Sequence, residues 1–298
     1  MHTVKTLYDS VKLKQTTEDL TMTRSHQDSS PLNNQLHSKD KCQICGDSLA
    51  QNLISKSRDY KGNKFESSWV ECMKCDSAHI DPYPKEEQLH SYYRSGYVEM
   101  DFDGTVDKNS NHKLHYSTEY EKVVFENYHF SLKDAKFSND DLHHKFILDY
   151  GCANGIFYKF LTEIYGISKN NIYGVDVESD MLQSCRKISP NFYSTKQIDK
   201  IERRFDLITM LNVIEHIYDP KLALKSIINL LKDDGEIFIE TPMYGPLAKK
   251  LGKDWSHFIV IEHINLFSRS AIKKMFDDFG MKCISESSFG ANIHGGGA

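Results

Sequence analysis

The chain has 298 residues, of which 39% are apolar and 27% are charged. This composition is typical of a globular protein and excludes collagen-like and wholly disordered chains. The formal net charge of -5 gives no overall attraction for a polyanion, so nucleic acid is not an expected partner. The sequence shows neither a membrane-spanning apolar run nor a secretory signal, so we expect a cytoplasmic protein.

Composition along the chain predicts four segments. Residues 1–40 are polar and predict a flexible tail. We expect a metal-binding module over 41–84, a helical connector and substrate-lid region over 85–140, and an α/β domain over 141–298.

Four of the seven cysteines form two pairs, each with two residues between its partners, and 26 residues separate the pairs. They are Cys42, Cys45, Cys72 and Cys75. In a reducing compartment such pairs indicate metal ligands rather than disulfides. Four thiolates complete tetrahedral zinc, so the spacing predicts a closed, structural zinc ribbon. The residues between the pairs mix basic, acidic and apolar types, which favours packing against a neighbouring domain over phosphate binding.

A proline-rich boundary at 81–84 precedes a helical pattern over 85–97. Tyr92, Tyr93 and Tyr97 lie close together in this pattern. Each tyrosine alone is best explained by packing, but their crowding makes them candidates for a wall of the substrate site.

From residue 145 onward, short apolar runs alternate with helical patterns. Strands are expected at 146–150, 172–177, 205–211, 235–240 and 281–287, and helices up to 164, from 180, at 221–231 and at 270–279. Such alternation predicts a Rossmann-like, doubly wound and mostly parallel sheet with helices on both faces. Ligands of these sheets bind beyond the carboxyl ends of the strands.

The first strand ends at Asp149 and leads into a loop of small residues over 151–155. Asp176 ends the second strand, 21 residues after Gly155. A glycine loop approaches a ligand closely, and a carboxylate at the next strand end accepts hydrogen bonds from ribose hydroxyls, so the pattern predicts an adenosine site. A nicotinamide dinucleotide site is disfavoured, because its loop continues with a further small residue whereas Ile156 and Phe157 follow Gly155 here.

Residues 145–288 resemble class I S-adenosylmethionine-dependent methyltransferases. The matching pieces are 147–157, 172–178, 205–208 with 213–217, and 230–242. The resemblance implies S-adenosylmethionine as cofactor. By it, the methionine part is surrounded by Asp149, Gly151, Ala153, Asn154 and Gly155, the ribose by Asp176, the adenine by Val177 and Met181, and the methyl group by Asn212. Ala153 stands where the family more often has glycine.

The order of cysteine pairs, tyrosine-rich helix and glycine loop is similar to the sugar C-methyltransferase group. Trp255, the Glu262-His263 pair and the 293–296 segment extend this similarity. It implies a small-molecule acceptor, such as a nucleotide-linked or polysaccharide-related sugar, methylated at carbon or oxygen. His263 with Glu262 is the expected proton-accepting pair, His216 is the second candidate base, and Trp255 is expected near the substrate.

The chain stops at Ala298, which predicts that the last strand and the additional C-terminal domain of this group are missing. Two other functions are compatible with the same motifs. One is a zinc-ribbon RNA methyltransferase, and the other is a non-catalytic cofactor-binding protein of the same fold.

Overall fold

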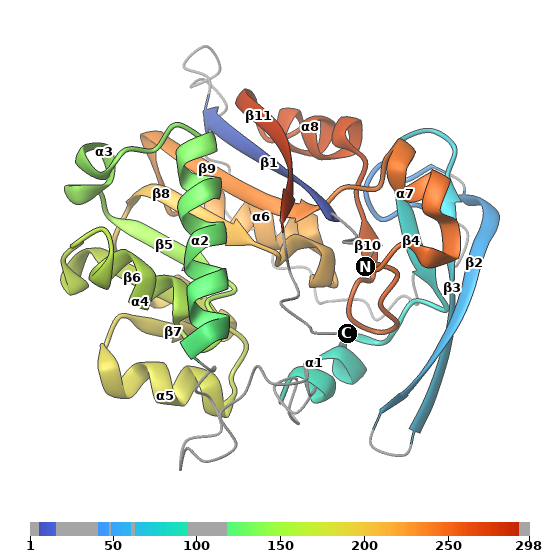
Figure 1. The fold of residues 1–298 in the computed structure, drawn as a ribbon, viewed down its shortest axis with the longest axis horizontal. Coiled ribbons are helices and arrows are strands. Elements are labelled where there is room, and N and C mark those ends of the chain that lie inside the picture. Colours follow the sequence, from blue (N-terminus) through green and yellow to red (C-terminus); the bar gives the residue numbers. More distant parts are fainter. Residues whose placement is uncertain (1–5, 16–40, 48, 61–62, 95–117, 292–298) are drawn as a thin grey trace.

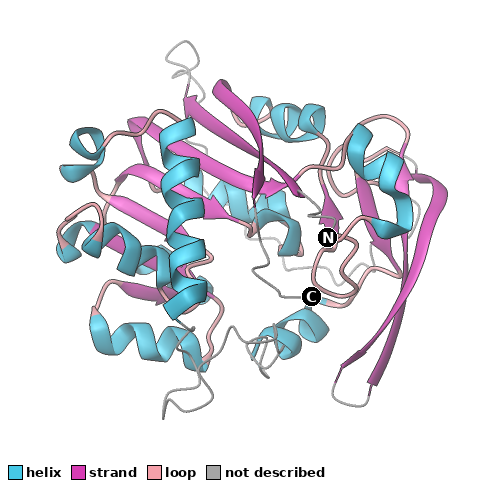
Figure 2. Cartoon of the chain, viewed as in Figure 1, coloured by secondary structure: helices cyan, strands magenta, loops and turns pink. Residues whose placement is uncertain are grey.

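The computed structural model describes residues 6–15, 41–47, 49–60, 63–94 and 118–291. A large sheet with helices on both faces occupies one side of the molecule, and a smaller antiparallel sheet lies beside it (Figures 1 and 2). The smaller sheet contains the predicted metal-binding module.

The large sheet has seven strands in the order β11-β1-β9-β8-β5-β6-β7. Its strands are β1 (Thr6–Gln15), β5 (Ile147–Tyr150), β6 (Ile172–Asp176), β7 (Phe192–Ser194), β8 (Phe205–Leu211), β9 (Leu231–Pro242) and β11 (Met281–Ala291). Pairing is parallel from β9 to β7. After β5 the chain adds β6 and β7 on one side of β5, and then β8 and β9 on the other, so the strand order reverses beside β5. The predicted Rossmann-like fold is therefore confirmed, and the carboxyl ends of β5 and β8 lie at the point where ligands of such sheets bind.

Strand β1 corrects the prediction of a flexible tail for residues 6–15, and the rest of 1–40 lies outside the described residues. It pairs antiparallel with both β9 and β11. A strand paired on both sides is held by main-chain hydrogen bonds, which every residue type except proline can make, so its polar sequence gave no signal.

The two faces of the sheet bury different residues, because successive side chains of a strand point to opposite sides. Ile147 and Phe238 pack with the helices on the front face in Figure 1, whereas Leu148 and Ile237 pack with the helices behind it. The front helices are α2 (Thr118–Asp134), α3 (Asn139–His143), α4 (Ile156–Glu163) and α5 (Asp180–Ile188), and those behind are α6 (Pro220–Ile228) and α8 (Arg269–Asp277). Short 3-10 helices are η3 (Lys169–Asn171), η4 (Thr195–Lys200), η5 (Ile214–His216) and η6 (Gly252–Asp254).

The small sheet joins the module to the α/β domain. It consists of β2 (Leu49–Tyr60), β3 (Asn63–Cys72), β4 (Ala78–Asp81) and β10 (Asn265–Leu266), all antiparallel, and α1 (Glu86–Arg94) follows it. β10 belongs to the segment between α7 (Pro246–Leu251) and α8, so two distant parts of the chain share one sheet. Trp69 of β3 is fully buried, its ring lies 5.0 Å from that of Phe258, and its Nε1 donates to the carbonyl oxygen of His263 at 3.2 Å. The expected packing of the module against its neighbour is therefore observed.

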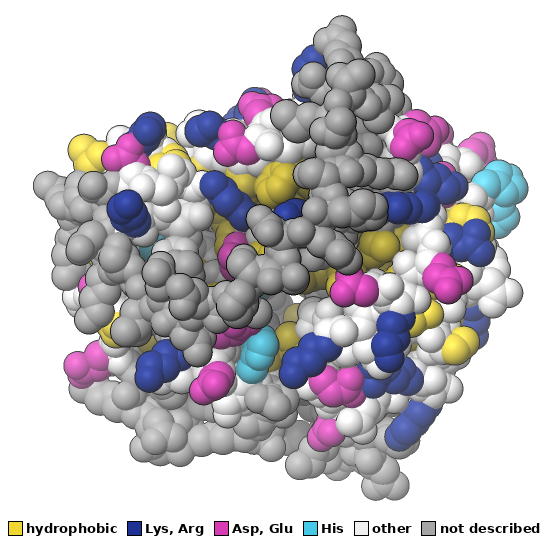
Figure 3. Space-filling view, turned by 180° about the vertical axis from the view of Figure 1, so that it is seen from behind, with side chains coloured by type: hydrophobic (Ala, Val, Ile, Leu, Met, Phe, Trp, Pro, Cys, Tyr) yellow, Lys and Arg dark blue, Asp and Glu magenta, His cyan; other side chains and the backbone are white. Residues whose placement is uncertain are grey.

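The surface mixes charges of both signs. On the face drawn in Figure 3, lysine and arginine side chains are interspersed with aspartate and glutamate. None of the helices in the described part of the chain is long and apolar enough to cross a membrane.

Trp69→Ala tests the joint core of the module and the domain. Removing this fully buried indole should lower the free energy of unfolding by about 3 to 5 kcal/mol, because the side chain spans both parts. Urea denaturation followed by circular dichroism measures the change. Met73→Ala is the control, since this side chain is 67% exposed. A loss no larger than that of the control would show that Trp69 does not hold the two parts together.

Candidate functional site

The loop between β5 and α4 has a backbone that requires glycine. Gly151 has φ of 85°, and a Cβ there would lie 2.3 Å from Cγ2 of Val213. Gly155, at the start of α4, also has a positive φ of 79°. Ala153 has φ of 45°, a region that glycine enters more easily, which accounts for the glycine preference at this position.

Two carboxyl groups flank this loop. Asp149 is buried at the end of β5, and its Oδ1 accepts a hydrogen bond from Oγ1 of Thr209 at 2.9 Å. Asp176, at the end of β6, accepts hydrogen bonds from the backbone amides of Ala153 and Val177, both at 2.6 Å. Desolvation raises the pKa of Asp149 to about 7 and that of Asp176 to about 6, and the charge of Asp176 raises the pKa of Asp149 further. A cation placed between these groups would favour their ionised forms.

The loop is open to a ligand. The remaining residues predicted to hold the cofactor lie along it or at neighbouring strand ends, and each except Gly155 is at least partly exposed: Gly151, Ala153, Asn154, Val177, Met181 and Asn212. Asn212 follows β8 with φ of 54°, and its Nδ2 donates to Oε1 of Glu240 at 3.4 Å. The structure therefore gathers the predicted cofactor residues around one niche, which we call the glycine niche.

Sequence analysis missed Glu240. It lies near the end of β9, is 5% exposed, and its Oε2 accepts a hydrogen bond from Oγ of Ser131 in α2 at 2.6 Å. Burial raises its pKa to about 7. A carboxylate near the end of a buried strand, as at Asp149 and Asp176, was the signal that could have found it.

A second cluster contains most of the residues predicted for the acceptor side. The hydroxyl of Tyr92 donates to Oε1 of Glu262 at 2.7 Å, and that of Tyr93 lies 2.9 Å from Nδ1 of His216. The rings of His216 and His263 are 4.8 Å apart. The charge of His216 lowers the pKa of Asp176, so this cluster adjoins the glycine niche. Tyr97 lies outside the described residues.

Backbone carbonyl groups orient both histidines. Nδ1 of His216 lies 2.9 Å from the carbonyl oxygen of Glu262, and Nδ1 of His263 lies 2.8 Å from that of His257. Because a carbonyl oxygen only accepts hydrogen bonds, each Nδ1 carries a proton. The nitrogen that each ring can offer as an acceptor is therefore Nε2.

Trp255 belongs to the same buried hydrophobic cluster as Tyr92 and Tyr93 but also borders a separate cavity. It is 3% exposed and lines a cavity of about 700 Å³ between α7 and α8 together with Tyr244 and Arg269. This cavity does not include the residues of the glycine niche. The Trp255 ring lies 5.2 Å from that of His257, which stacks on His263 at 5.5 Å.

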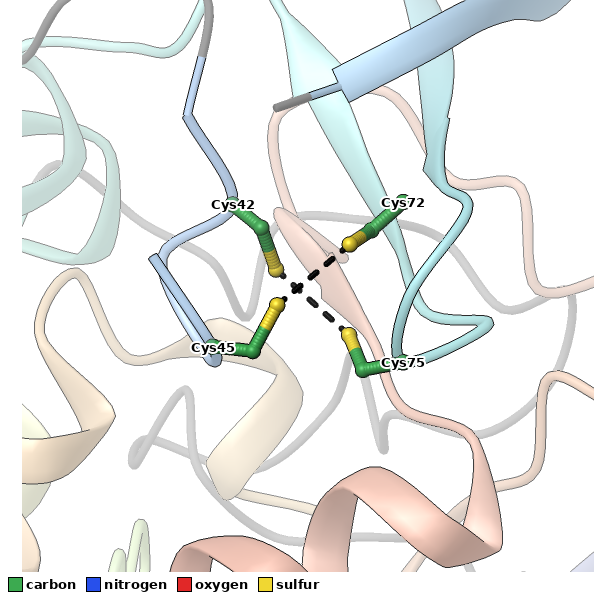
Figure 4. A group of neighbouring side chains, drawn as sticks. All are labelled: Cys42, Cys45, Cys72 and Cys75. Atoms are coloured by element: carbon green, nitrogen blue, oxygen red, sulfur yellow. Dashed lines mark hydrogen bonds between the residues drawn. The ribbon is translucent and has the colours of Figure 1, made fainter. Parts of the chain in front are cut away.

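The four cysteines of the module converge on one point (Figure 4). The sulfur atoms of Cys42 and Cys75 are 3.6 Å apart, those of Cys45 and Cys72 are 3.4 Å apart, and all four lie within 4.8 Å of one another. Tetrahedral zinc with Zn–S bonds of about 2.3 Å requires S–S separations of about 3.8 Å, so the cluster can hold such an ion.

A histidine that the sequence did not single out supports this cluster. Nε2 of His79 lies 3.1 Å from the sulfur of Cys42, and its Nδ1 lies 2.9 Å from Oδ1 of Asn265 in β10. Burial lowers the pKa of His79 to about 4, so the ring is neutral. The bond joins the cluster to the segment that follows His263 in the chain.

Comparison with known proteins gives three findings. A family model described as a methyltransferase domain matches residues 119–286, more than half of the chain. The ubiquinone biosynthesis O-methyltransferase of Actinobacillus pleuropneumoniae serotype 7 is 30% identical over 110 residues, which cover 33% of this chain and 45% of that protein. The mitochondrial ubiquinone biosynthesis O-methyltransferase of Candida albicans is 27% identical over 106 residues, 32% of each chain. The chain thus spans less than half the length of these curated relatives.

Solved structures with a similar arrangement are distant in sequence. Magnesium protoporphyrin IX methyltransferase from Synechocystis PCC 6803, with bound SAH, has a TM-score of 0.41 and 14% identity. The similarity covers 59% of this chain and 79% of that chain.

Asp149→Asn tests the cost of burying a carboxyl group beside the glycine niche. The pKa of Asp149 is about 7 in the folded chain, and its ordinary value is 3.8. Between these pH values the carboxyl group is ionised in the unfolded chain but protonated in the folded chain, so a rise in pH stabilises the unfolded chain relative to the folded one. The free energy of unfolding of the unmodified chain should therefore fall relative to that of the variant by up to about 4 kcal/mol between about pH 4 and pH 8. Denaturant titrations across this range measure the difference. Exposed Asp234→Asn is the control, and parallel curves for Asp149→Asn and the unmodified chain would contradict the assignment.

Proposed function

Because the chain belongs to the methyltransferase-domain family, we propose that it transfers a methyl group from S-adenosylmethionine to a small metabolite. The observation that carries this proposal is the pair of desolvated carboxyl groups, Asp149 and Asp176, on either side of the glycine niche. Both have raised pKa values, so both favour a ligand that brings positive charge.

The residues of the niche fit the parts of this cofactor. S-adenosylmethionine supplies a methyl group activated by a sulfonium charge. Asp176 lies at a strand end, where its carboxylate can accept hydrogen bonds from ribose hydroxyl groups. Asp149 lies in β5, just before the loop glycines, and its charge would favour the ammonium and sulfonium groups. Exposed Asn212 reaches the rim on which the methyl group would lie.

The histidine cluster would form the acceptor side. His263 is the proposed base, with Glu262 beside it in the chain and His216 as the second candidate. Tyr92 and Tyr93 bring hydroxyl groups and aromatic faces to the same cluster. Aromatic faces suit the apolar faces of a sugar ring, and together with the motifs shared with sugar C-methyltransferases they support a nucleotide-linked or polysaccharide-related sugar, methylated at carbon or oxygen.

Isothermal titration calorimetry with S-adenosylmethionine tests the first half of this proposal. Asp176→Ala should weaken binding by about tenfold to a hundredfold, because charge-assisted hydrogen bonds to the ribose would be lost. Asp233→Ala, at an exposed position, removes the same charge away from the niche and is the matched control. Absence of binding, or equal affinity for Asp176→Ala and the unmodified chain, would refute the cofactor assignment.

Transfer itself requires a second measurement. The protein is incubated with cofactor labelled in the methyl group and with a library of sugar nucleotides and phenols, and products are identified by mass spectrometry. A labelled sugar would support the proposed acceptor class. A labelled phenol would contradict it and assign a phenolic acceptor instead. Cofactor binding without transfer to any acceptor would favour a non-catalytic binding protein.

We further propose that the four cysteines hold a structural zinc ion. Four sulfur ligands leave no open position, and the four sulfur atoms lie within 4.8 Å of one another. The module has a small core, so the ion would contribute to its folding.

Cys72→Ser should abolish tight zinc binding by the cysteine cluster and lower the melting temperature, because three thiolates bind zinc more weakly than four. Elemental analysis and thermal denaturation of the dialysed protein measure the two effects. Cys283→Ser is the matched control, since Cys283 lies on β11 outside the cluster. Equal zinc content in both variants would contradict the assignment.

A further inference from the structure

We propose that Glu215, His216 and His263 form a second metal site, which holds a divalent transition-metal ion between the glycine niche and the acceptor side. The site uses none of the four cysteines. It goes beyond the proposed function, because an ion can bind there whether or not the protein transfers a methyl group.

The three side chains converge. One ligand atom from each lies within 4.8 Å of the other two. Oε1 of Glu215 is 3.7 Å from Nε2 of His216, which is too far for a direct hydrogen bond but matches two ligands of one ion. The rings of His216 and His263 meet at 75° with centroids 4.8 Å apart, so they do not stack.

The hydrogen bonds of both rings resemble those of metal-binding histidines. Nδ1 of His216 faces the carbonyl oxygen of Glu262, and Nδ1 of His263 faces that of His257. A histidine that binds metal through one nitrogen usually donates its other N–H to a carbonyl or carboxylate, which fixes the ring and its tautomer. Both rings are therefore already oriented to offer Nε2.

The carboxyl group of Glu215 is the part of this cluster that most needs a ligand. Its side chain is 1% exposed, and Oε2 accepts a hydrogen bond from Oγ1 of Thr241 at 2.9 Å. Oε1 is buried and has no hydrogen-bond partner among the residues that the structure describes. A buried oxygen in this state is costly, and a metal ion would satisfy it.

The chemistry of the ligands selects the class of ion. Two imidazoles and one carboxylate suit Zn²⁺, Mn²⁺, Fe²⁺ or Co²⁺, whereas Mg²⁺ and Ca²⁺ prefer oxygen ligands alone. Three protein ligands leave positions open, as in catalytic metal sites. If the proposed function holds, these positions would take oxygen atoms of the acceptor. An imidazole nitrogen that binds the ion cannot also accept a proton. His216 and His263 therefore act either as metal ligands or as bases, and the metal content of the protein decides between these two roles.

Zinc stoichiometry of the full chain tests the site. The protein is loaded with Zn²⁺, dialysed, and analysed for zinc by mass spectrometry. We expect two ions per chain in the unmodified protein, one in Glu215→Gln and one in Cys72→Ser. Glu215→Gln keeps the size of the side chain and an acceptor for Thr241, and chelator competition should show its second site weakened by about a hundredfold or more. Exposed His143→Gln is the matched control and should retain two ions.

One zinc ion per chain that is lost only in Cys72→Ser would overturn the proposal, as would two ions retained in Glu215→Gln. His216→Asn provides a second variant in case Glu215→Gln does not fold, and circular dichroism identifies such a failure. S-adenosylmethionine titration of the same samples separates the two proposals. Cofactor binding without a second ion would refute the metal site alone, and a second ion without cofactor binding would refute the proposed function alone.

Discussion

The site depends on the unfavourable burial of four carboxyl groups at one edge of the sheet. They are Asp149, Asp176, Glu215 and Glu240, and desolvation raises the pKa of each. Hydroxyl groups of Thr209, Thr241 and Ser131 donate to three of them, and backbone amides donate to Asp176. These donors are neutral and offset only part of the cost of desolvating negative charge, and for Asp176 and Glu215 the charge of His216 is a further favourable contribution. A cationic nucleoside in the glycine niche and an ion beside His216 would both supply further positive charge.

The cysteine module takes part in building the acceptor side. His263 immediately precedes Ile264 and β10, and β10 is the edge strand of the module's sheet. Nε1 of Trp69 donates to the carbonyl oxygen of His263, and His79 connects Cys42 to Asn265 of β10. A metal ion held by the cysteines would therefore fix a segment that carries a proposed catalytic group. These side-chain contacts and the pairing of β10 with β4 couple the module to the position of His263.

Features encoded by neighbouring residues could be predicted from the sequence, whereas features encoded by distant residues could not. The loop after Asp149, the carboxylate of Asp176 and the cysteine pairs each depend on short spacings, and the structure brings each set together. The Ser131–Glu240 and Tyr92–Glu262 hydrogen bonds join residues 109 and 170 positions apart, so no local pattern reveals them. Strand β1 was missed for the same reason, because its partners in the sheet are β9 and β11.

The raised pKa values also bear on how a product would leave. Under the proposed function, Asp149 lies near a sulfonium charge only before methyl transfer, so its attraction for the bound nucleoside falls when transfer is complete. Interactions that are lost on product formation do not hold the product in the site. With a pKa of about 7, Asp149 can take up a proton near neutral pH once the sulfonium charge has gone. The desolvation that favours the cationic nucleoside therefore also favours release of the neutral one.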